Sequence, residues 1–471
     1  MLLKHLLPPD LAYPLLVIEW LIRIVMLFVV PLRRSPEATR SWLLLILFLP
    51  IPGIILYLAI GRPKFPAWRV ARAQGLLPFY AALGDKLASA APPTSECPSI
   101  QALGEQLGRL PPVCGNRVEF SDDYDGAIAR LIEDIDGAQH HVRLLVYIFA
   151  DDATGREVIA ALARAVARGV RVHVLVDPVG SHHWRRGTIH RLRDAGVEVR
   201  EVLPLRVLRG RTRRDMRNHR KLFLIDGTIG WAGSQNIVAK DFAKGIVNRE
   251  LVARVEGPAV AEMEAIFLGD WYLETEEMLD SPDVPAPAGD ATVQLLPSGA
   301  DYPLEGFETL LIWQIHEARE RVVMVTPYLI PDEDLIGAMR TAVLRGVTID
   351  LVVSQVVDHP IVRLAQCSFY DDLLRSGVRI WAFRDYLLHA KSVSIDGRLA
   401  VVGSSNVDIR SFQLNEEVSL LLYDAPEIER LEAFQRGYLD NSDRIDLDAW
   451  RKRPAIRRLG ENFARLVSPL L

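Results

Sequence analysis

Two long apolar segments begin the chain. The first, Leu11 to Leu32, has Glu19 and Arg23 as its only charged residues, and the second, Ser41 to Ile60, has none. About 20 apolar residues are needed to cross the hydrocarbon core of a bilayer, and both segments reach that length. Buried core helices are the alternative, whereas a cleaved signal peptide is excluded because no small-residue cleavage site follows the first segment. We therefore predict an N-terminal hairpin of two transmembrane helices.

Three details of this hairpin follow from its sequence. Pro50 and Pro52 should kink the second helix. Glu19 and Arg23 are one helical turn apart, so they can form an ion pair. Basic residues flank both segments, so the positive-inside rule does not decide which side of the membrane holds the rest of the chain.

After the hairpin, short apolar strands alternate with amphipathic helices. Val142 to Phe149 and Val322 to Ile330 are apolar strands, and each precedes a helix that ends in Arg-Gly-Val and a second apolar strand (Glu157 to Asp177 and Asp334 to Ser354). This order is typical of a parallel βαβ unit. Since the unit occurs twice, we predict an α/β fold with two pseudo-symmetric lobes.

Two segments rich in Pro, Ala and Ser divide this part of the chain, at Asp85 to Ser99 and at Ser281 to Asp290. The predicted domains are the transmembrane helices (1–64), a linker (65–100), the first lobe (101–280), a second linker (281–291) and the second lobe (292–471).

Composition narrows the classes of function. The chain has 471 residues, 49% of them hydrophobic and 24% charged, which is typical of a globular protein. Its formal net charge of -5 gives no overall attraction to nucleic acid or to an anionic surface, so any attraction to phosphate must be local. The three cysteines have no metal-binding spacing and do not identify a redox compartment.

The two lobes share a polar motif. Its first copy has His219, Lys221 and Asp226, followed by Ser234, Asn236 and Glu250; its second copy has His389, Lys391 and Asp396, followed by Ser404, Asn406 and Glu417. Side chains alternate between the two faces of an extended strand, so each histidine shares a face with its lysine. The aspartates have the opposite parity, and we expect them to brace the local structure.

A motif of this kind, present twice, favours phosphodiester exchange. One histidine can attack phosphorus and form a covalent phosphoenzyme. The other can protonate the leaving alcohol and then deprotonate the incoming one. The lysines and asparagines can hold the phosphate oxygens. Glu250 or Glu417 can hold each imidazole in one tautomer. Since each lobe supplies half of a site, the two lobes must face each other.

Three other interpretations of the motif compete with catalysis. One His-x-Lys pair is usually a feature of a surface strand, but two copies with identical offsets argue against that interpretation. A metal site would need more carboxylates or histidines, and lysine is a poor neighbour for a cation, so we expect no metal. An inactive lipid-binding scaffold would be expected to have lost a histidine or a lysine from one copy, and neither is lost.

The paired His-x-Lys-x4-Asp motifs with Gly-Ser-x-Asn resemble those of the phospholipase D superfamily. The segments "LPIPGIILYLAIGRP", "RNHRKLFLIDG" and "VVGSSNVDIRSFQLNEEVSLLLYD" are similar to the bacterial cardiolipin synthase family, and the similarity covers essentially the whole chain. It implies two phospholipase D-type lobes, each a mixed sheet flanked by helices, and a phosphohistidine intermediate without metal or cofactor. By resemblance His219 is the nucleophile and His389 the general acid and base.

The same resemblance implies the substrate and the location. Two phosphatidylglycerols would be condensed into cardiolipin and glycerol by a multi-pass protein of the bacterial inner membrane. The alternatives are a hydrolytic phospholipase D, a transferase with another acceptor such as phosphatidylethanolamine, and, more distantly, a membrane-tethered nuclease. Because the chain begins with two apolar segments, we expect no nucleic acid partner.

Two basic segments add to the expectation of an anionic lipid substrate. The approach to the first motif has seven arginines, at positions 206, 209, 211, 213, 214, 217 and 220. We expect this run to capture anionic headgroups rather than to form a solvated loop. The segment Trp450 to Leu471 mixes basic and apolar residues, and either contact with the bilayer or a cap on the second lobe would explain it.

Overall fold

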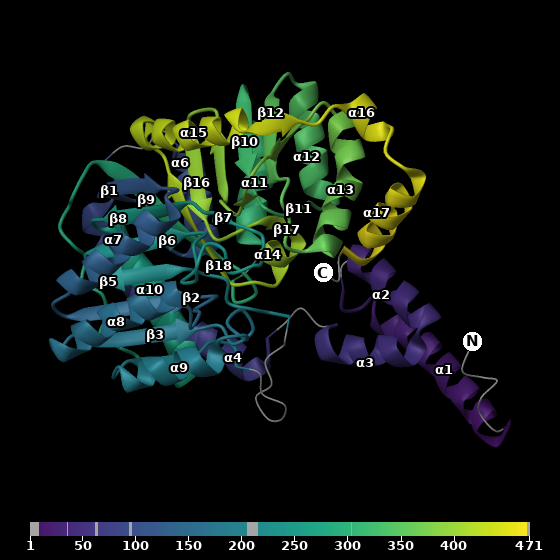
Figure 1. Cartoon of the computed structure of the whole chain (residues 1–471), viewed down its shortest axis with the longest axis horizontal. Helices are drawn as coiled ribbons and strands as arrows, with labels where there is room; N and C mark the ends of the chain where they lie inside the picture. Colours follow the sequence, from purple (N-terminus) through teal and green to yellow (C-terminus); the bar gives the residue numbers. More distant parts are fainter. Residues whose placement is uncertain are drawn as a thin grey trace.

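The computed structural model describes residues 9–34, 36–61, 65–93, 97–204, 215–302 and 304–468. Within these residues the body of the protein is built on one mixed sheet of 15 strands flanked by helices, and three N-terminal helices project from its side (Figure 1). The expected α/β fold with a mixed sheet is therefore confirmed.

The strands of the sheet belong to two halves of the chain. In the first half they are β1 (Val113–Ser121), β2 (His141–Val146), β3 (Arg171–Val176), β4 (Glu198–Glu201), β5 (Leu222–Ile225), β6 (Ile229–Gly233) and β8 (Val252–Glu256). In the second half they are β9 (Ala291–Ser298), β10 (Arg321–Val325), β12 (Thr348–Ser354), β13 (Arg379–Phe383), β15 (Ser392–Ile395), β16 (Leu399–Gly403), β18 (Glu417–Leu422) and β19 (Ser442–Arg444).

The two halves meet where β1 pairs with β9, and we call this antiparallel pair the seam. From the seam outward, the first half runs β1, β8, β6, β5, β2, β3, β4, and the second runs β9, β18, β16, β15, β10, β12, β13, β19. The order is thus the same in both directions, apart from the additional β19. The pairs β2·β3 and β10·β12 are parallel, which confirms both predicted βαβ units.

Helices accompany the strands in both halves, with more of them in the second. The first half contains α7 (Tyr124–Gly137), α8 (Ala153–Ala167), α9 (Arg185–Asp194) and α10 (Ala259–Thr275). The second contains α11 (Gly306–Glu317), α12 (Glu333–Leu344), α13 (Pro360–Arg375), α14 (Ile409–Gln413), α15 (Ala425–Asp440), α16 (Leu447–Arg451) and α17 (Ala455–Val467). Soon after α8 and α12 come Gly169 and Gly346, with φ of 90° and 96°, as the Arg-Gly-Val pattern predicts.

The N-terminal region folds into α1 (Pro9–Val29), α2 (Pro36–Phe48) and α3 (Pro50–Ile60). The second apolar segment is broken before Pro50, where a kink was expected. Glu19 and Arg23 form the expected ion pair, with 3.4 Å between their charged groups. In the part of the chain that the structure describes, no helix combines the length and the hydropathy needed to cross a membrane. The predicted transmembrane hairpin is therefore not confirmed.

The segment between the N-terminal helices and the sheet contains further helices, although it was predicted as a linker. They are α4 (Ala67–Gly75), α5 (Leu77–Leu87), the short 3-10 helix η2 (Ala88–Ala90) and, from its end onward, α6 (Pro98–Gly108). Arg69 of α4 is fully buried and forms ion pairs with Glu274 at 2.6 Å and with Asp301 at 3.1 Å. This segment is therefore fastened to the body by buried charges.

Candidate active site

A cavity of about 640 Å³ lies between the two halves of the molecule. Its walls contain both motif histidines, both asparagines and one of the glutamates: His219, His389, Asn236, Asn406 and Glu250. The cavity therefore joins motif side chains that are separated by as much as 187 positions (219 to 406) in the sequence.

Short strand pairings across the two halves bring the histidines to this cavity. Asn218 forms a parallel bridge with Glu416, and the N–H of His219 donates to the carbonyl of Glu416 at 2.8 Å. At the equivalent place, β7 (Asn248–Arg249) pairs in parallel with β14 (Leu387–Leu388). The N–H of His389 there donates to the carbonyl of Arg249 at 2.7 Å. Each histidine is thus fixed to the backbone of the other half.

As a result, each imidazole contacts the carboxylate of the opposite half. Nδ1 of His219 lies 3.0 Å from both carboxylate oxygens of Glu417. Nδ1 of His389 lies 2.8 and 2.9 Å from those of Glu250. We call these two contacts the crossed pairs. A carboxylate at Nδ1 holds the proton on that nitrogen and leaves Nε2 as the nitrogen that can react.

Serine hydroxyls support the glutamates. Ser404 donates to Glu417 at 2.5 Å, and Ser411 donates to the other carboxylate oxygen at 3.0 Å. Burial favours the neutral acid, but the pKa of Glu417 is lowered because His219, Lys221 and Ser404 favour its charged form. The pKa of Glu250 is lowered in the same way, chiefly by His389. Both carboxylates are therefore ionised at neutral pH.

The histidines themselves are held neutral. Burial lowers the pKa of His219 to about 4, and the opposing effect of Glu417 does not compensate. Burial likewise lowers the pKa of His389. A neutral imidazole has a free lone pair at Nε2, so both rings are prepared to act as a nucleophile or as a base.

The two lysines lie beside their histidines. Nζ of Lys221 donates to the carbonyl of His219 at 2.5 Å, and Nζ of Lys391 donates to that of His389 at 2.7 Å. Burial lowers the pKa of Lys221 to about 7 and that of Lys391 to about 8. Two buried ammonium groups close to one cavity attract an anion, and a bound phosphate would in turn favour their charged form.

The aspartates of the motif lie in turns. Asp226 and Asp396 directly follow β5 and β15, with φ of 52° and 51°. The carboxylate of Asp226 accepts from the N–H groups of Gln139, His140 and His141 at 2.7 to 2.8 Å. That of Asp396 accepts from the N–H groups of three consecutive residues at 2.7 to 2.9 Å. The contacts of Asp226 thus connect the end of β5 to the beginning of β2, and those of Asp396 connect the end of β15 to the beginning of β10.

The two asparagines differ in their contacts. Oδ1 of Asn236 accepts from the N–H of Ile148 at 3.0 Å. Oδ1 of Asn406 is buried and has no hydrogen-bond partner within the described residues. Ser234, the counterpart of Ser404, donates to the carbonyl of Leu251 at 3.1 Å and lowers the pKa of Glu250 by a hydrogen bond.

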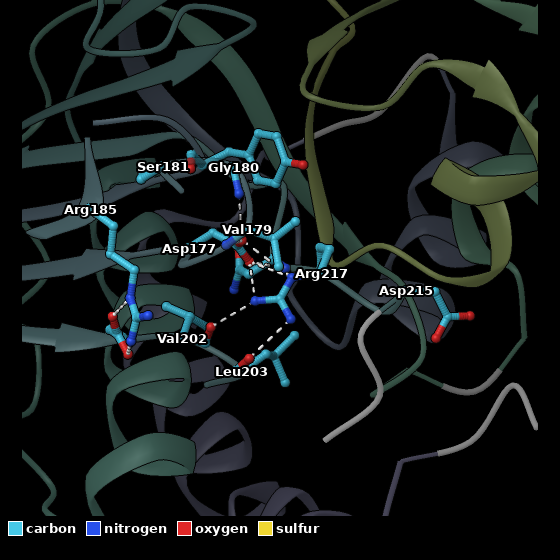
Figure 2. A network of polar contacts seen from close by, with 12 residues as sticks. Asp177, Val179, Gly180, Ser181, Arg185, Val202, Leu203, Asp215 and Arg217 are labelled. Atoms are coloured by element: carbon cyan, nitrogen blue, oxygen red, sulfur yellow. Dashed lines mark hydrogen bonds and ion pairs between the residues drawn. The ribbon is translucent and has the colours of Figure 1, made fainter. Parts of the chain in front are cut away.

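Buried arginines hold only the first motif. Arg217 donates to the Asp177 carboxylate at 2.9 Å and to the carbonyls of Leu203 and Val202, as Figure 2 shows. Arg220 forms ion pairs with Asp270 at 2.7 Å and Glu416 at 2.8 Å.

For Arg217 and Arg220 these contacts correct the expectation that the arginine run captures headgroups, because both are fully buried and paired within the protein. The other five arginines of the run lie outside the described residues. At the equivalent positions the second motif has Leu387 and Ala390, so the two motifs are fastened differently.

Aromatic residues at the site were not predicted from the sequence. The ring of Tyr147 packs edge-on to that of His219 with 4.9 Å between centroids, and Tyr328 is similarly placed at 6.4 Å from His389. Both tyrosines follow the first strand of a βαβ unit, and this repeat was the signal that could have identified them. His182, His183 and His359 also line the cavity and carry no repeat signal.

No group of three or more histidine, cysteine or carboxylate side chains in the described segments has an arrangement that could bind a metal ion.

Comparisons with known proteins show which family this chain is similar to. The model of the family described as "Cardiolipin synthase, PLD-like domain" matches residues 131–271 and 311–437, and the model described as "Phospholipase_D-nuclease N-terminal" matches residues 17–62. Cardiolipin synthase A of Serratia proteamaculans is 35% identical over 457 residues, which cover 93% of this chain and 94% of that protein. Cardiolipin synthase A of Proteus mirabilis is 34% identical over 471 residues, covering 96% of this chain and 97% of that protein.

A solved structure has the same fold. The phosphatidylserine synthase of Haemophilus influenzae aligns with a TM-score of 0.58 and 15% identity, over 79% of this chain and 100% of that chain.

Proposed function

The chain belongs to the cardiolipin synthase family of phospholipase D-like proteins, and we propose that it condenses two phosphatidylglycerols into cardiolipin and glycerol. The observation that carries this proposal is that the two motif histidines, one from each half, line one cavity, and that each has its lysine hydrogen-bonded to its backbone carbonyl. Two reactive imidazoles suit a transfer in two steps, because the same phosphorus must be attacked twice.

In the first step, Nε2 of His219 attacks the phosphorus of a donor phosphatidylglycerol. A P–N bond forms, the P–O bond to the headgroup glycerol breaks, and His389 donates a proton to the departing glycerol oxygen. The anionic phosphate of the bound substrate favours the protonated form of His389, which the free enzyme disfavours through burial. Lys221 and Lys391 neutralise the charge that develops on the phosphate oxygens.

In the second step, a hydroxyl of the second phosphatidylglycerol attacks the phosphorus of the phosphohistidine. His389 removes the proton from this hydroxyl, a new P–O bond forms and the P–N bond to His219 breaks. His219 returns to its neutral form, and His389 is again protonated for the next cycle. Glu417 and Glu250 hold the two rings by Nδ1 throughout.

The assignment of His219 as nucleophile is part of the proposal. The greater fixation of the first motif, by Arg217 and Arg220, supports it, because a nucleophile that carries the covalent intermediate benefits from a rigid position. Acid-free trapping of the phosphoenzyme, followed by peptide mass spectrometry, tests the assignment. Phosphate on His389 would reverse the two roles.

Mass spectrometry of the products from defined lipid vesicles tests the reaction itself. Phosphatidylglycerol should yield cardiolipin and free glycerol in equal amounts. Phosphatidic acid as the only product would identify a hydrolytic phospholipase D, and cleavage of DNA with the lipid untouched would identify a nuclease. Mixtures that contain phosphatidylethanolamine determine the acceptor, since its amine headgroup would give a product of different mass.

A lipid substrate also favours a location of the protein at the membrane. A bacterial relative and the matched N-terminal family model support an association with the membrane. We propose that the N-terminal region inserts into the inner membrane as a multi-pass anchor, and that the cavity receives anionic phospholipids from that membrane. Fractionation of bacterial membranes with alkaline washing tests this, because an inserted protein stays in the pellet.

A further inference from the structure

Helix α17 carries its apolar side chains on the outside. Ile456, Leu459, Phe463 and Leu466 are exposed to 77%, 65%, 67% and 54%. Their spacing of three and four residues places them in one stripe along the helix. A surface helix of a globular protein normally turns such a stripe toward the core. Helix α17 therefore turns its apolar side toward the outside instead of toward the core.

The opposite side of the helix faces the protein. Glu461 is fully buried, Ala464 is 4% exposed, and the helix packs along α13. Glu461 forms an ion pair with Arg453 at 2.8 Å, and Arg465 forms one with Asp372 at 2.8 Å. Polar contacts thus hold α17 against the body, and its apolar stripe is left for another surface.

The position of α17 connects this stripe with the active site. Ser468, at the C-terminal end of the helix, lines the same cavity as His219 and His389. In Figure 1, α17 lies on the side of the molecule from which α1 projects. Helix α1 also exposes large apolar side chains, among them Trp20 and Phe28 at 56% and 67%. Two exposed apolar surfaces therefore lie on the same side of the molecule, and one of them, on α17, ends at the cavity.

We propose that α17 lies in the headgroup region of an anionic bilayer and holds the mouth of the cavity against the lipid surface. The apolar stripe enters the boundary between headgroups and acyl chains, and the exposed Arg458 beside it contacts lipid phosphates, whereas Arg457 and Arg465 keep their ion pairs with Glu461 and Asp372. This proposal deepens the proposed function, since it states how a lipid substrate reaches the histidines. Both suggested roles of the C-terminal segment are combined: it caps α13 and contacts the bilayer.

A second copy of the chain is a less suitable occupant of the stripe. The exposed Arg458 beside the stripe would be brought close to its own counterpart in a two-fold interface centred on the stripe, and like charges in contact weaken association. An anionic lipid surface pairs with the same arginine.

Fluorescence quenching tests the contact without relying on catalysis. The full-length Phe463→Cys protein is labelled with a polarity-sensitive fluorophore and reconstituted in vesicles of phosphatidylethanolamine and phosphatidylglycerol that contain brominated acyl chains. We expect strong quenching and a blue shift of the label. Leu344→Cys is the matched control, because Leu344 is 80% exposed at the end of α12 and does not line the cavity. Equal quenching at both positions, or none at position 463, would overturn the proposal.

A second experiment uses Leu459→Gln with Phe463→Gln, both exposed and outside the cavity lining. The variant should lose roughly tenfold or more of its activity on vesicles, because each large apolar side chain that leaves water contributes about that factor. Its activity on monomeric short-chain phosphatidylglycerol should not change. An unchanged ratio of the two activities contradicts the role of α17. Absence of cardiolipin in both assays, with quenching retained, would instead contradict the proposed reaction. Cross-linking between copies at position 463 would identify a dimer contact.

Discussion

The charges of Lys221 and Lys391 should make the activity of the site depend on pH. Burial lowers the pKa values of these ammonium groups to about 7 and about 8, so they carry their positive charges below these values and lose them as the pH rises through them. We expect kcat/KM for phosphatidylglycerol to fall as the pH increases across this window. The measurement is a pH profile at constant ionic strength, and a flat profile through the window would contradict the expectation.

Lys221→Met isolates the charge from the fold. This variant keeps an unbranched side chain only one atom shorter and without charge, so we expect a folded protein whose kcat/KM is lower by on the order of 100-fold or more. Kinetics and thermal unfolding are measured on the same preparation. Retention of most of the activity would show that the phosphate is held elsewhere.

Asp226→Asn should act mainly on stability. Its carboxylate accepts three backbone N–H groups, and hydrogen bonds to a charged group contribute roughly 1.5–3 kcal/mol each. Asparagine also tolerates the φ of 52°, so the backbone stays unstrained. We expect a lower Tm and a near-normal kcat for the molecules that remain folded. Full stability combined with lost catalysis would place the aspartate in the reaction.

For single residues, the sequence predicted which side chains form the site better than it predicted which of them contact each other. Repetition identified the histidines, lysines and asparagines, because identical offsets in two copies are improbable by chance. It did not tell whether Glu250 serves His219 or His389. That choice depends on which strand edges meet, and the crossed pairs arise from contacts between residues 218 and 416 and between β7 and β14.

Among the elements, the extended segment before β5 depends on buried charges. Removing Arg217 leaves Asp177 buried without its ion pair, and an unpaired buried charge costs roughly 3–5 kcal/mol. We therefore expect Arg217→Met to lower the free energy of unfolding by about that amount. Chemical denaturation monitored by tryptophan fluorescence measures it.

Arg117→Met is the matched control for this variant. Arg117 forms an ion pair with Glu256 on the surface, where its side chain is 54% exposed. Exposed pairs contribute roughly 0–1 kcal/mol, so this variant should remain near the unsubstituted protein. An equal loss of unfolding free energy in both variants would mean that the buried ion pair stabilises the protein no more than the exposed one.

The pattern of apolar positions predicted most elements of the βαβ units, since a strand, a helix and a turn each leave a local signal. It did not predict the helices in residues 65–100. Those helices are stabilised by distant partners, such as the ion pairs of Arg69 with residues 274 and 301, and such contacts leave no local pattern. The Pro/Ala/Ser content of the segment therefore suggested a linker.

For the molecule as a whole, the crossed pairs make the two halves interdependent. Glu417→Gln should impair His219, in the other half, and so slow the formation of the phosphohistidine. Glu250→Gln should impair His389 and so slow protonation of the leaving glycerol. Each change should cost on the order of 10³–10⁴-fold in kcat, as expected when a carboxylate that fixes a catalytic imidazole is removed.

Rapid-quench measurements distinguish the two variants. With Glu250→Gln, an analogue whose leaving group needs no proton should restore formation of the phosphohistidine. With Glu417→Gln it should not. The same response in both variants would mean that the crossed pairs do not divide the roles.

The continuous sheet was the feature least accessible from sequence. Two repeated units predicted two lobes, but the antiparallel seam between β1 and β9 joins them by backbone hydrogen bonds. Backbone pairing at an edge depends on few side chains, so an apolar strand that ends a sheet resembles one that continues it.

The crossed pairs also have a consequence during protein synthesis. The ribosome makes His219 nearly 200 residues before Glu417 (417 - 219 = 198), so a chain that stops in between has the imidazole without its carboxylate. Such a fragment also lacks Glu416, whose carbonyl fixes the backbone of His219. Under the proposed mechanism, we therefore expect incomplete chains to form the phosphohistidine inefficiently. Under the proposed mechanism, activity thus begins only after β18, the strand that starts with Glu417, has been added beside β9.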